Sequence, residues 1–237
     1  MPDLSQSVQK PAYPSLRDKA SLLAYVRYFW RDLVLLAAFF PALSLMELLN
    51  RPFGTVHSLE IAFDSKIPLL PWTVLIYHSW APLIIVLIVF YLLRDRGLFR
   101  RYVLAMIVGQ LLANVSFLFF QTMVPRPEAQ VSQATDIFSR ILGLTYGVDN
   151  PYCGFPSIHV LLCTLTILFV WQLKDAKTWF KILVSLYFTA VAISTVTTKQ
   201  HVVLDIPGGI VYALVAFLLT KSLIRLIERK FYGDLYR

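Results

Sequence analysis

The chain has 237 residues, of which 57% are hydrophobic and 15% charged, with a formal net charge of +8 at pH 7. Ordinary soluble domains are less hydrophobic, so the composition indicates a membrane protein. The basic residues flank apolar segments and form no separate basic domain, so membrane topology accounts for them and no nucleic-acid partner is expected. Cys153 and Cys163 would lie about 15 Å apart along a helix, so neither a disulfide nor a cysteine-based metal site is expected.

The N-terminal residues predict a helix on the membrane surface. They lack the short apolar core and cleavage site of a signal peptide. The stretch Ser15–Asp18 resembles a capping box, and apolar residues then recur at helical spacing from Leu22 to Leu33. We therefore expect segment 1–31 to be a cytoplasmic amphipathic helix at the interface.

Six apolar runs follow, each about long enough to cross a bilayer, which needs roughly 20 residues. They predict an all-α, polytopic membrane protein: a six-transmembrane-helix bundle over 32–228, followed by a cytoplasmic tail, 229–237. The loop 124–155 is long for a connection, so it is a candidate lid or substrate-binding element. The runs are Asp32–Leu49, Leu69–Leu93, Tyr102–Met123, Pro156–Leu173, Trp179–Val196 and Ile206–Leu226.

The basic residues predict the orientation of these spans. Seventeen of the 22 Lys and Arg residues fall on the side that holds both termini and the second and fourth connections. By the positive-inside rule both termini are cytoplasmic. The expected location is a bacterial inner membrane, with the opposite ends of the spans facing the periplasm or exterior.

Several polar residues gather on that outer side. His201 and Asp205 are four residues apart, so on a helix the carboxylate would reach the imidazole. His159 begins another apolar run, and Arg126 lies in the loop before it. The third span also carries a polar stripe, made of Gln110, Asn114 and Gln121. Because these residues fall within roughly 40° of one another on a helical wheel, we interpret the stripe mainly as a helix-packing contact.

These residue types fit the chemistry of a phosphate ester. In-line displacement at phosphorus needs a nucleophile, donors for the non-bridging oxygens and an acid for the leaving oxygen. His201, oriented by Asp205, is the candidate nucleophile, and His159 is the candidate proton donor. The predicted phosphate ligands are Arg126 and Ser157, the latter at a helix N-terminus, and Lys199 is a weaker candidate.

Taken together, the motifs resemble the type 2 phosphatidic acid phosphatase superfamily. The resemblance covers about 126–209 and rests on Arg126-Pro127, on Pro156-Ser157-Ile158-His159, and on Ser194 with His201 and Asp205. The chain departs from the family pattern at three positions: Phe119 stands in place of lysine, Ile158 in place of glycine and Thr195 in place of arginine. Two of the family's phosphate-binding cations are therefore missing.

Within the superfamily, these departures make the chain more similar to the inositol phosphorylceramide synthase-like branch, which transfers phosphorylated head groups between lipids. The resemblance implies a lipid phosphate or phospholipid substrate and a possible hydroxyl acceptor, with no cofactor. The alternative is a non-enzymatic transporter or ion path, which would need polar residues at several depths of several spans. A metal site is also not expected, because Arg126 would lie beside the cation.

Overall fold

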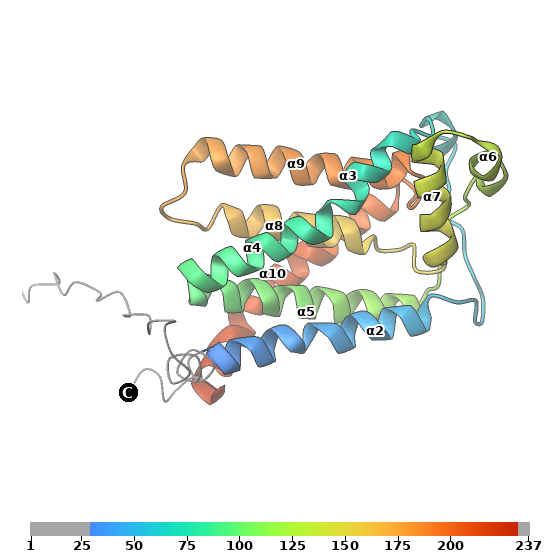
Figure 1. The fold of residues 1–237 in the computed structure, drawn as a ribbon. Coiled ribbons are helices and arrows are strands. Elements are labelled where there is room, and N and C mark those ends of the chain that lie inside the picture. The colour runs from blue at the N-terminus through green and yellow to red at the C-terminus, as the bar shows by residue number, and fades with distance from the viewer. Residues whose placement is uncertain (1–28, 232–237) are drawn as a thin grey trace, which may run out of the picture.

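The computed structural model describes residues 29–231, and its regular elements are helices (Figure 1). The first described helical segment is Phe29–Leu49, of which α2 (Phe39–Leu49) is the second part. The other elements are η1 (Asp64–Lys66), η2 (Pro71–Thr73), α3 (Val74–His78), α4 (Trp80–Arg94), α5 (Arg96–Phe119), α6 (Glu128–Gln133), α7 (Ile137–Val148), α8 (Ile158–Val170), α9 (Thr178–Thr197) and α10 (Asp205–Phe231). The amphipathic helix expected in segment 1–31 lies outside the described residues, apart from 29–31.

Five helical segments of the described chain are long and apolar enough to cross a bilayer, which confirms an all-α polytopic membrane bundle. The fourth predicted span forms a shorter helix: α8 has 13 residues and extends about 20 Å. The chain turns directly after Val170, and nine of the 13 residues of α8 are buried. Because other helices surround α8, it does not need the length of a lipid-facing span.

The second predicted span is interrupted rather than continuous. It consists of η2, α3 and α4, and α3 ends at His78. Pro82 has no amide hydrogen for the carbonyl of His78, which weakens the helix at this point. The hydroxyl of Ser79 instead donates to the carbonyl of Ile76 at 2.5 Å. The break changes the direction of the chain between α3 and α4 (Figure 1).

The third predicted span begins earlier than expected. We predicted Tyr102 as its first residue, whereas α5 begins at Arg96, where the side chain of Asp95 accepts the amide of Leu98. The buried carboxylate of Asp32 holds this basic stretch inside the bundle. It accepts hydrogen bonds from Nε of Arg96 at 2.6 Å and from Nε of Arg100 at 2.7 Å, so its single negative charge is shared by two guanidinium groups.

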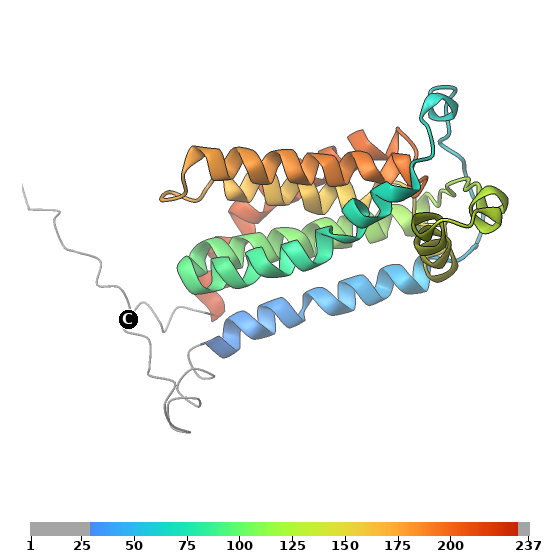
Figure 2. The same ribbon diagram turned by 45° about the horizontal axis from the view of Figure 1, so that its top comes forward.

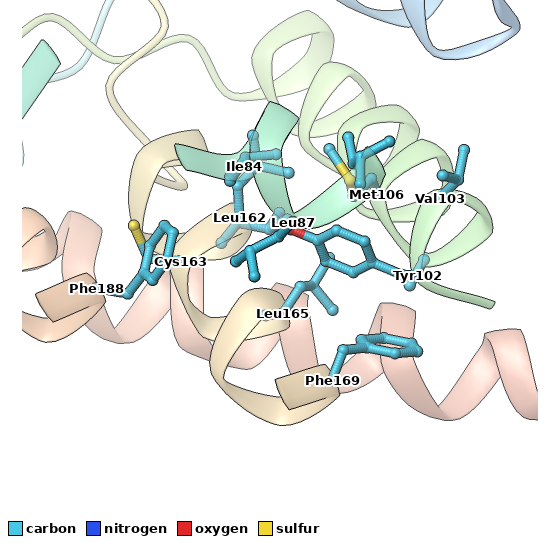
Figure 3. Close-up of a cluster of buried hydrophobic side chains, with 14 of the residues drawn as sticks. Ile84, Leu87, Tyr102, Val103, Met106, Leu162, Cys163, Leu165, Phe169 and Phe188 are labelled. Atoms are coloured by element: carbon cyan, nitrogen blue, oxygen red, sulfur yellow. The ribbon is translucent and has the colours of Figure 1, made fainter. Parts of the chain in front are cut away.

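The centre of the bundle is formed by α5 and α8. α5 packs against α2, α4, α8 and α10, and α8 packs also against α9 and α10. Figure 3 shows their shared core, in which the ring of Tyr102 lies beside Phe169, with centroids 5.3 Å apart. The Tyr102 hydroxyl is hydrogen-bonded to Thr166 Oγ1 at 2.7 Å, so this buried polar group is satisfied.

The polar stripe of α5 makes structural contacts, as interpreted from the sequence. Gln110 donates to Asn114, and Asn114 donates to the carbonyl of Ala42 on α2. Gln121, just beyond α5, donates to the carbonyls of Leu49 and Arg51. These bonds join α2 and its following loop to α5.

The loops that hold the predicted site residues gather at one end of the bundle, opposite the α4–α5 and α8–α9 connections (Figure 1). Here α7 runs crosswise to the long helices and α6 lies beside it (Figures 1 and 2). Asp136 caps α7 by accepting the amides of Phe138 and Ser139, and the bonds to Ser139 lower the pKa of its carboxyl. The expected loop 124–155 thus contains two helices; its role as a lid stays a prediction.

Candidate active site

A tight turn between α9 and α10 holds His201 and Asp205. The backbone amides of Gln200 and His201 both donate to the carbonyl of Thr195, at 2.9 and 3.0 Å. Lys199 lies in this turn with a φ of 54°, and Asp205 is the first residue of α10. The four-residue spacing does bring the carboxylate to the imidazole, but through a turn and not along a helix.

The surroundings of His201 determine its tautomer. Nδ1 lies 3.1 Å from Asp205 Oδ2 and 3.1 Å from the carbonyl oxygen of Gly154. Since a carbonyl can only accept, Nδ1 carries the hydrogen, and Nε2 of the neutral ring keeps its lone pair. Asp205 is 1% exposed, and its Oδ2 is held by the amide of Val202 at 3.0 Å. His201 is therefore oriented as a nucleophile or base acting through Nε2.

His159 lies opposite, in the first turn of α8. Its ring centroid is 5.6 Å from that of His201. Two aromatic side chains surround it: Tyr77 from α3, at 4.6 Å, and Trp80 from α4, at 5.1 Å. The break between α3 and α4 thus places one aromatic ring from each helix against His159.

Arg126 is held in a fixed position beside the two histidines. Its Nη1 donates to the carbonyl of Asp149, and its Nη2 donates to Oε1 of Gln200 at 2.6 Å. Nη2 also lies 3.6 Å from the carboxylate of Asp149. The guanidinium lies over the ring of Tyr146, 5.1 Å from its centroid. The terminal nitrogens are therefore engaged by the protein, whereas the buried Nε has no hydrogen-bond partner among the described residues.

Ser157 and Lys199, the other predicted phosphate ligands, have protein partners. The hydroxyl oxygen of Ser157 accepts a hydrogen bond from the backbone amide of Val160 and so caps α8. This cap fixes the residue at which the helix begins. Nζ of Lys199 donates to the carbonyls of Asp64 and Ile67, at 2.9 and 2.7 Å. Phosphate binding by either side chain stays a prediction.

Three spaces share these residues in their linings. A small pocket of about 50 Å³ is lined by Arg126, Asp149, His159, Gln200 and His201, among others. His201 also borders a vestibule of about 530 Å³, whose lining is mainly polar and includes Glu60, Ser65, Gln130 and Lys199. His159 also borders an apolar groove of about 640 Å³, whose lining includes Met46, Tyr77, Trp80, Ile141 and Leu144. Besides the small pocket that they share, the two histidines thus border different spaces.

Sequence reasoning missed several of these residues. Gln200 and Asp149 bind Arg126 directly, and Tyr77 and Trp80 contact His159. Gln200 has one sequence signal, its place next to His201 at the end of an apolar run. The others come from segments whose approach to the site depends on how the helices pack.

The family model of the PAP2 superfamily matches residues 52–219, which include the predicted site residues from Arg126 to Asp205. No curated protein matches the chain.

Proposed function

The chain belongs to the PAP2 superfamily, and from this premise we propose that it is an integral membrane lipid phosphatase or phosphotransferase. It cleaves or transfers the phosphate or phosphorylated head group of a lipid. The observation that carries this proposal is the arrangement of the small pocket. His201, whose Nδ1 faces Asp205, lies 5.6 Å from His159 between ring centroids, and both line one pocket with Arg126.

The reaction proceeds in two displacements at phosphorus. In the first, the Nε2 lone pair of His201 attacks, the bond from phosphorus to the lipid oxygen breaks, and protonated His159 gives its proton to that oxygen. Asp205 stabilises the positive charge that forms on His201. In the second, water or a hydroxyl group attacks the phosphohistidine, His159 accepts its proton, and His201 regains its lone pair.

The spaces around the pocket support a lipid substrate. His159, the donor to the leaving oxygen, borders the apolar groove, so the departing lipid portion lies among apolar side chains. His201 borders the polar vestibule, which suits the polar part of the substrate that stays on phosphorus, while water or a hydroxyl acceptor attacks from the His159 side, opposite the P–N bond. The separation of an apolar groove from a polar vestibule also supports head-group transfer, as in the inositol phosphorylceramide synthase-like branch. The lipid portion would lie in the groove and the polar head group in the vestibule. We place the site at the outer membrane face, as the basic residues predict.

The alternative of a proton or ion path has less support. The side-chain nitrogens of Gln110 and Asn114 in α5 donate to Asn114 and to the carbonyl of Ala42, so these amides join helices and do not continue into a path.

The roles of the two histidines are tested with two substrates that differ in leaving group. His159→Ala is expected to be nearly inactive on a lipid phosphate, because general acid catalysis contributes about 10² to 10⁴-fold. It should regain much of its rate on an aryl phosphate, whose leaving group is already stable as an anion. His201→Ala should be inactive on both, since no leaving group replaces a missing nucleophile.

A phosphoenzyme assay completes this test. Acid-labile, base-stable phosphate label is expected on His159→Ala protein after aryl ester treatment, and none is expected on His201→Ala. Equal rescue of both variants by the aryl ester, or rescue of His201→Ala alone, would contradict the assignment.

A further inference from the structure

Two buried donors on residues that line the small pocket have no partner within the described part of the chain, and they belong to the hydrogen-bonded pair Arg126 and Gln200. Nε of Arg126 and the amide nitrogen of Gln200 lack a hydrogen-bond partner among the described residues. Gln200 is 3% exposed, and it lines the pocket together with both histidines. A buried donor without an acceptor has lost its hydration without compensation. A ligand that accepts from both donors would restore these bonds.

We propose that the Gln200 amide, together with Nε of Arg126, binds the non-bridging oxygens of the phosphoryl group, an inference that rests on the proposed function. The orientation of the amide supports it. A guanidinium only donates hydrogen bonds, so the Gln200 oxygen must face Nη2 of Arg126, which it does at 2.6 Å. Because the amide group is planar and its oxygen faces Arg126, its nitrogen points in another direction, where no described residue accepts a hydrogen bond from it.

The charge around the pocket indicates which phosphate the site accepts. The positions of the two missing family cations hold Phe119, which is 82% exposed, and the uncharged Thr195. Nζ of Lys199 is occupied by two backbone carbonyls. The charge of Arg126 is partly offset by the carboxylate of Asp149 at 3.6 Å. Apart from the proton that His159 gives to the leaving oxygen, one offset cation and a neutral amide suit the single negative charge of a phosphodiester better than the second charge of a phosphomonoester.

Two substitutions separate binding of phosphate by Gln200 from positioning of Arg126. Gln200→Glu keeps an acceptor for Nη2 of Arg126 but removes the donor, and Gln200→Leu removes both. For Gln200→Glu we expect kcat on a lipid phosphodiester to fall about 10²-fold or more, as when one oxyanion donor is lost. Inhibition by orthovanadate should weaken by a similar factor. The matched control is Gln133→Glu, which adds the same charge on the exposed end of α6 and should leave both values unchanged.

The opposite pattern overturns the proposal. If Gln200→Glu keeps the wild-type kcat and vanadate inhibition while Gln200→Leu loses them, Gln200 acts only by holding Arg126. Failure of the proposed function is distinguished by the phosphoenzyme assay on His159→Ala protein, which keeps Gln200. His159→Ala protein that acquires no acid-labile label from the aryl ester contradicts that function, whatever the Gln200 variants do.

The preference for a single charge is tested with an aryl phosphomonoester and an aryl phosphodiester that share one leaving group. The monoester gains its second charge near pH 6, whereas the diester keeps one charge. We expect the monoester-to-diester ratio of kcat/KM to fall up to tenfold per pH unit above about pH 6. The protein's charged groups are the same in both assays, so their effect cancels in the ratio; those at the pocket are Arg126, Asp149, His159, His201 and, hydrogen-bonded to His201, Asp205. A ratio that stays constant or rises with pH would overturn the single-charge preference.

Discussion

At the residue scale, the carbonyl of Gly154 changes what is expected of a substitution at Asp205. In a catalytic triad, replacing the carboxylate by an amide lowers turnover about 10⁴-fold, largely because the histidine adopts the wrong tautomer. Here the Gly154 carbonyl also lies 3.1 Å from Nδ1 of His201 and would keep the hydrogen there. For Asp205→Asn we therefore expect a smaller loss of kcat, on the order of 10² to 10³-fold, from the missing negative charge alone.

Steady-state kinetics and a thermal melt of the purified variant check this expectation. The fold should persist, because the amide oxygen of Asn can still accept from Val202 and His201. Near-normal turnover would mean that the His201–Asp205 pair is structural. A loss of kcat of about 10⁴-fold, as in a catalytic triad, would mean that the Gly154 carbonyl alone does not keep the hydrogen on Nδ1 of His201.

At the element scale, the close contact between α8 and α10 positions the catalytic turn. A Cβ atom at Gly209 would lie 2.7 Å from the carbonyl oxygen of Ser157 and 2.8 Å from Cβ of Val160, so α10 would have to move. Asp205 is one helical turn before Gly209, at the start of α10. Gly209→Ala should therefore destabilise the protein by about 1–3 kcal/mol, as overpacking does, and lower kcat by displacing Asp205.

The matched control is Gly147→Ala in α7, where a Cβ atom meets nothing within 4 Å. Alanine is the better helix former, so this change should be neutral or stabilise the protein by up to about 1 kcal/mol. Chemical denaturation and turnover are measured for both variants. A Gly209→Ala protein with wild-type stability and kcat would show that the two helices separate freely.

At the scale of the whole molecule, the orientation in the membrane is a prediction that labelling can test. The native thiols give little background: Cys163 is buried, and burial together with Asp149 raises the pKa of Cys153 to about 12, so its thiol stays protonated. An impermeant maleimide should label Arg140→Cys on intact cells. Lys174→Cys, in the α8–α9 connection, should be labelled only after permeabilisation.

Both variants are made in a Cys153→Ser, Cys163→Ala background, and the unsubstituted background is the control. Labelling of Lys174→Cys from outside intact cells would reverse the orientation and place the site at the cytoplasmic face.

Sequence alone was enough to predict the all-α membrane bundle and the contact between His201 and Asp205. Long apolar runs partition into lipid because of their own composition, so hydropathy located five of the six predicted spans as long apolar helices. The contact of His201 with Asp205 followed from a spacing of four residues, which any tight turn or helix can close. The helical wheel of α5 likewise indicated that Gln110 and Asn114 face another helix; Asn114 donates to the carbonyl of Ala42 on α2, and Gln110 donates to Asn114.

Only the tertiary structure decided what surrounds these groups. It brought Tyr77 and Trp80 to His159 and Gln200 to Arg126, and it directed Nζ of Lys199 to two backbone carbonyls. It also made α8 a short buried helix, because neighbouring helices take the place of lipid around it. These features depend on contacts between segments far apart in the chain, and hydropathy and spacing describe only the preferences of each segment alone.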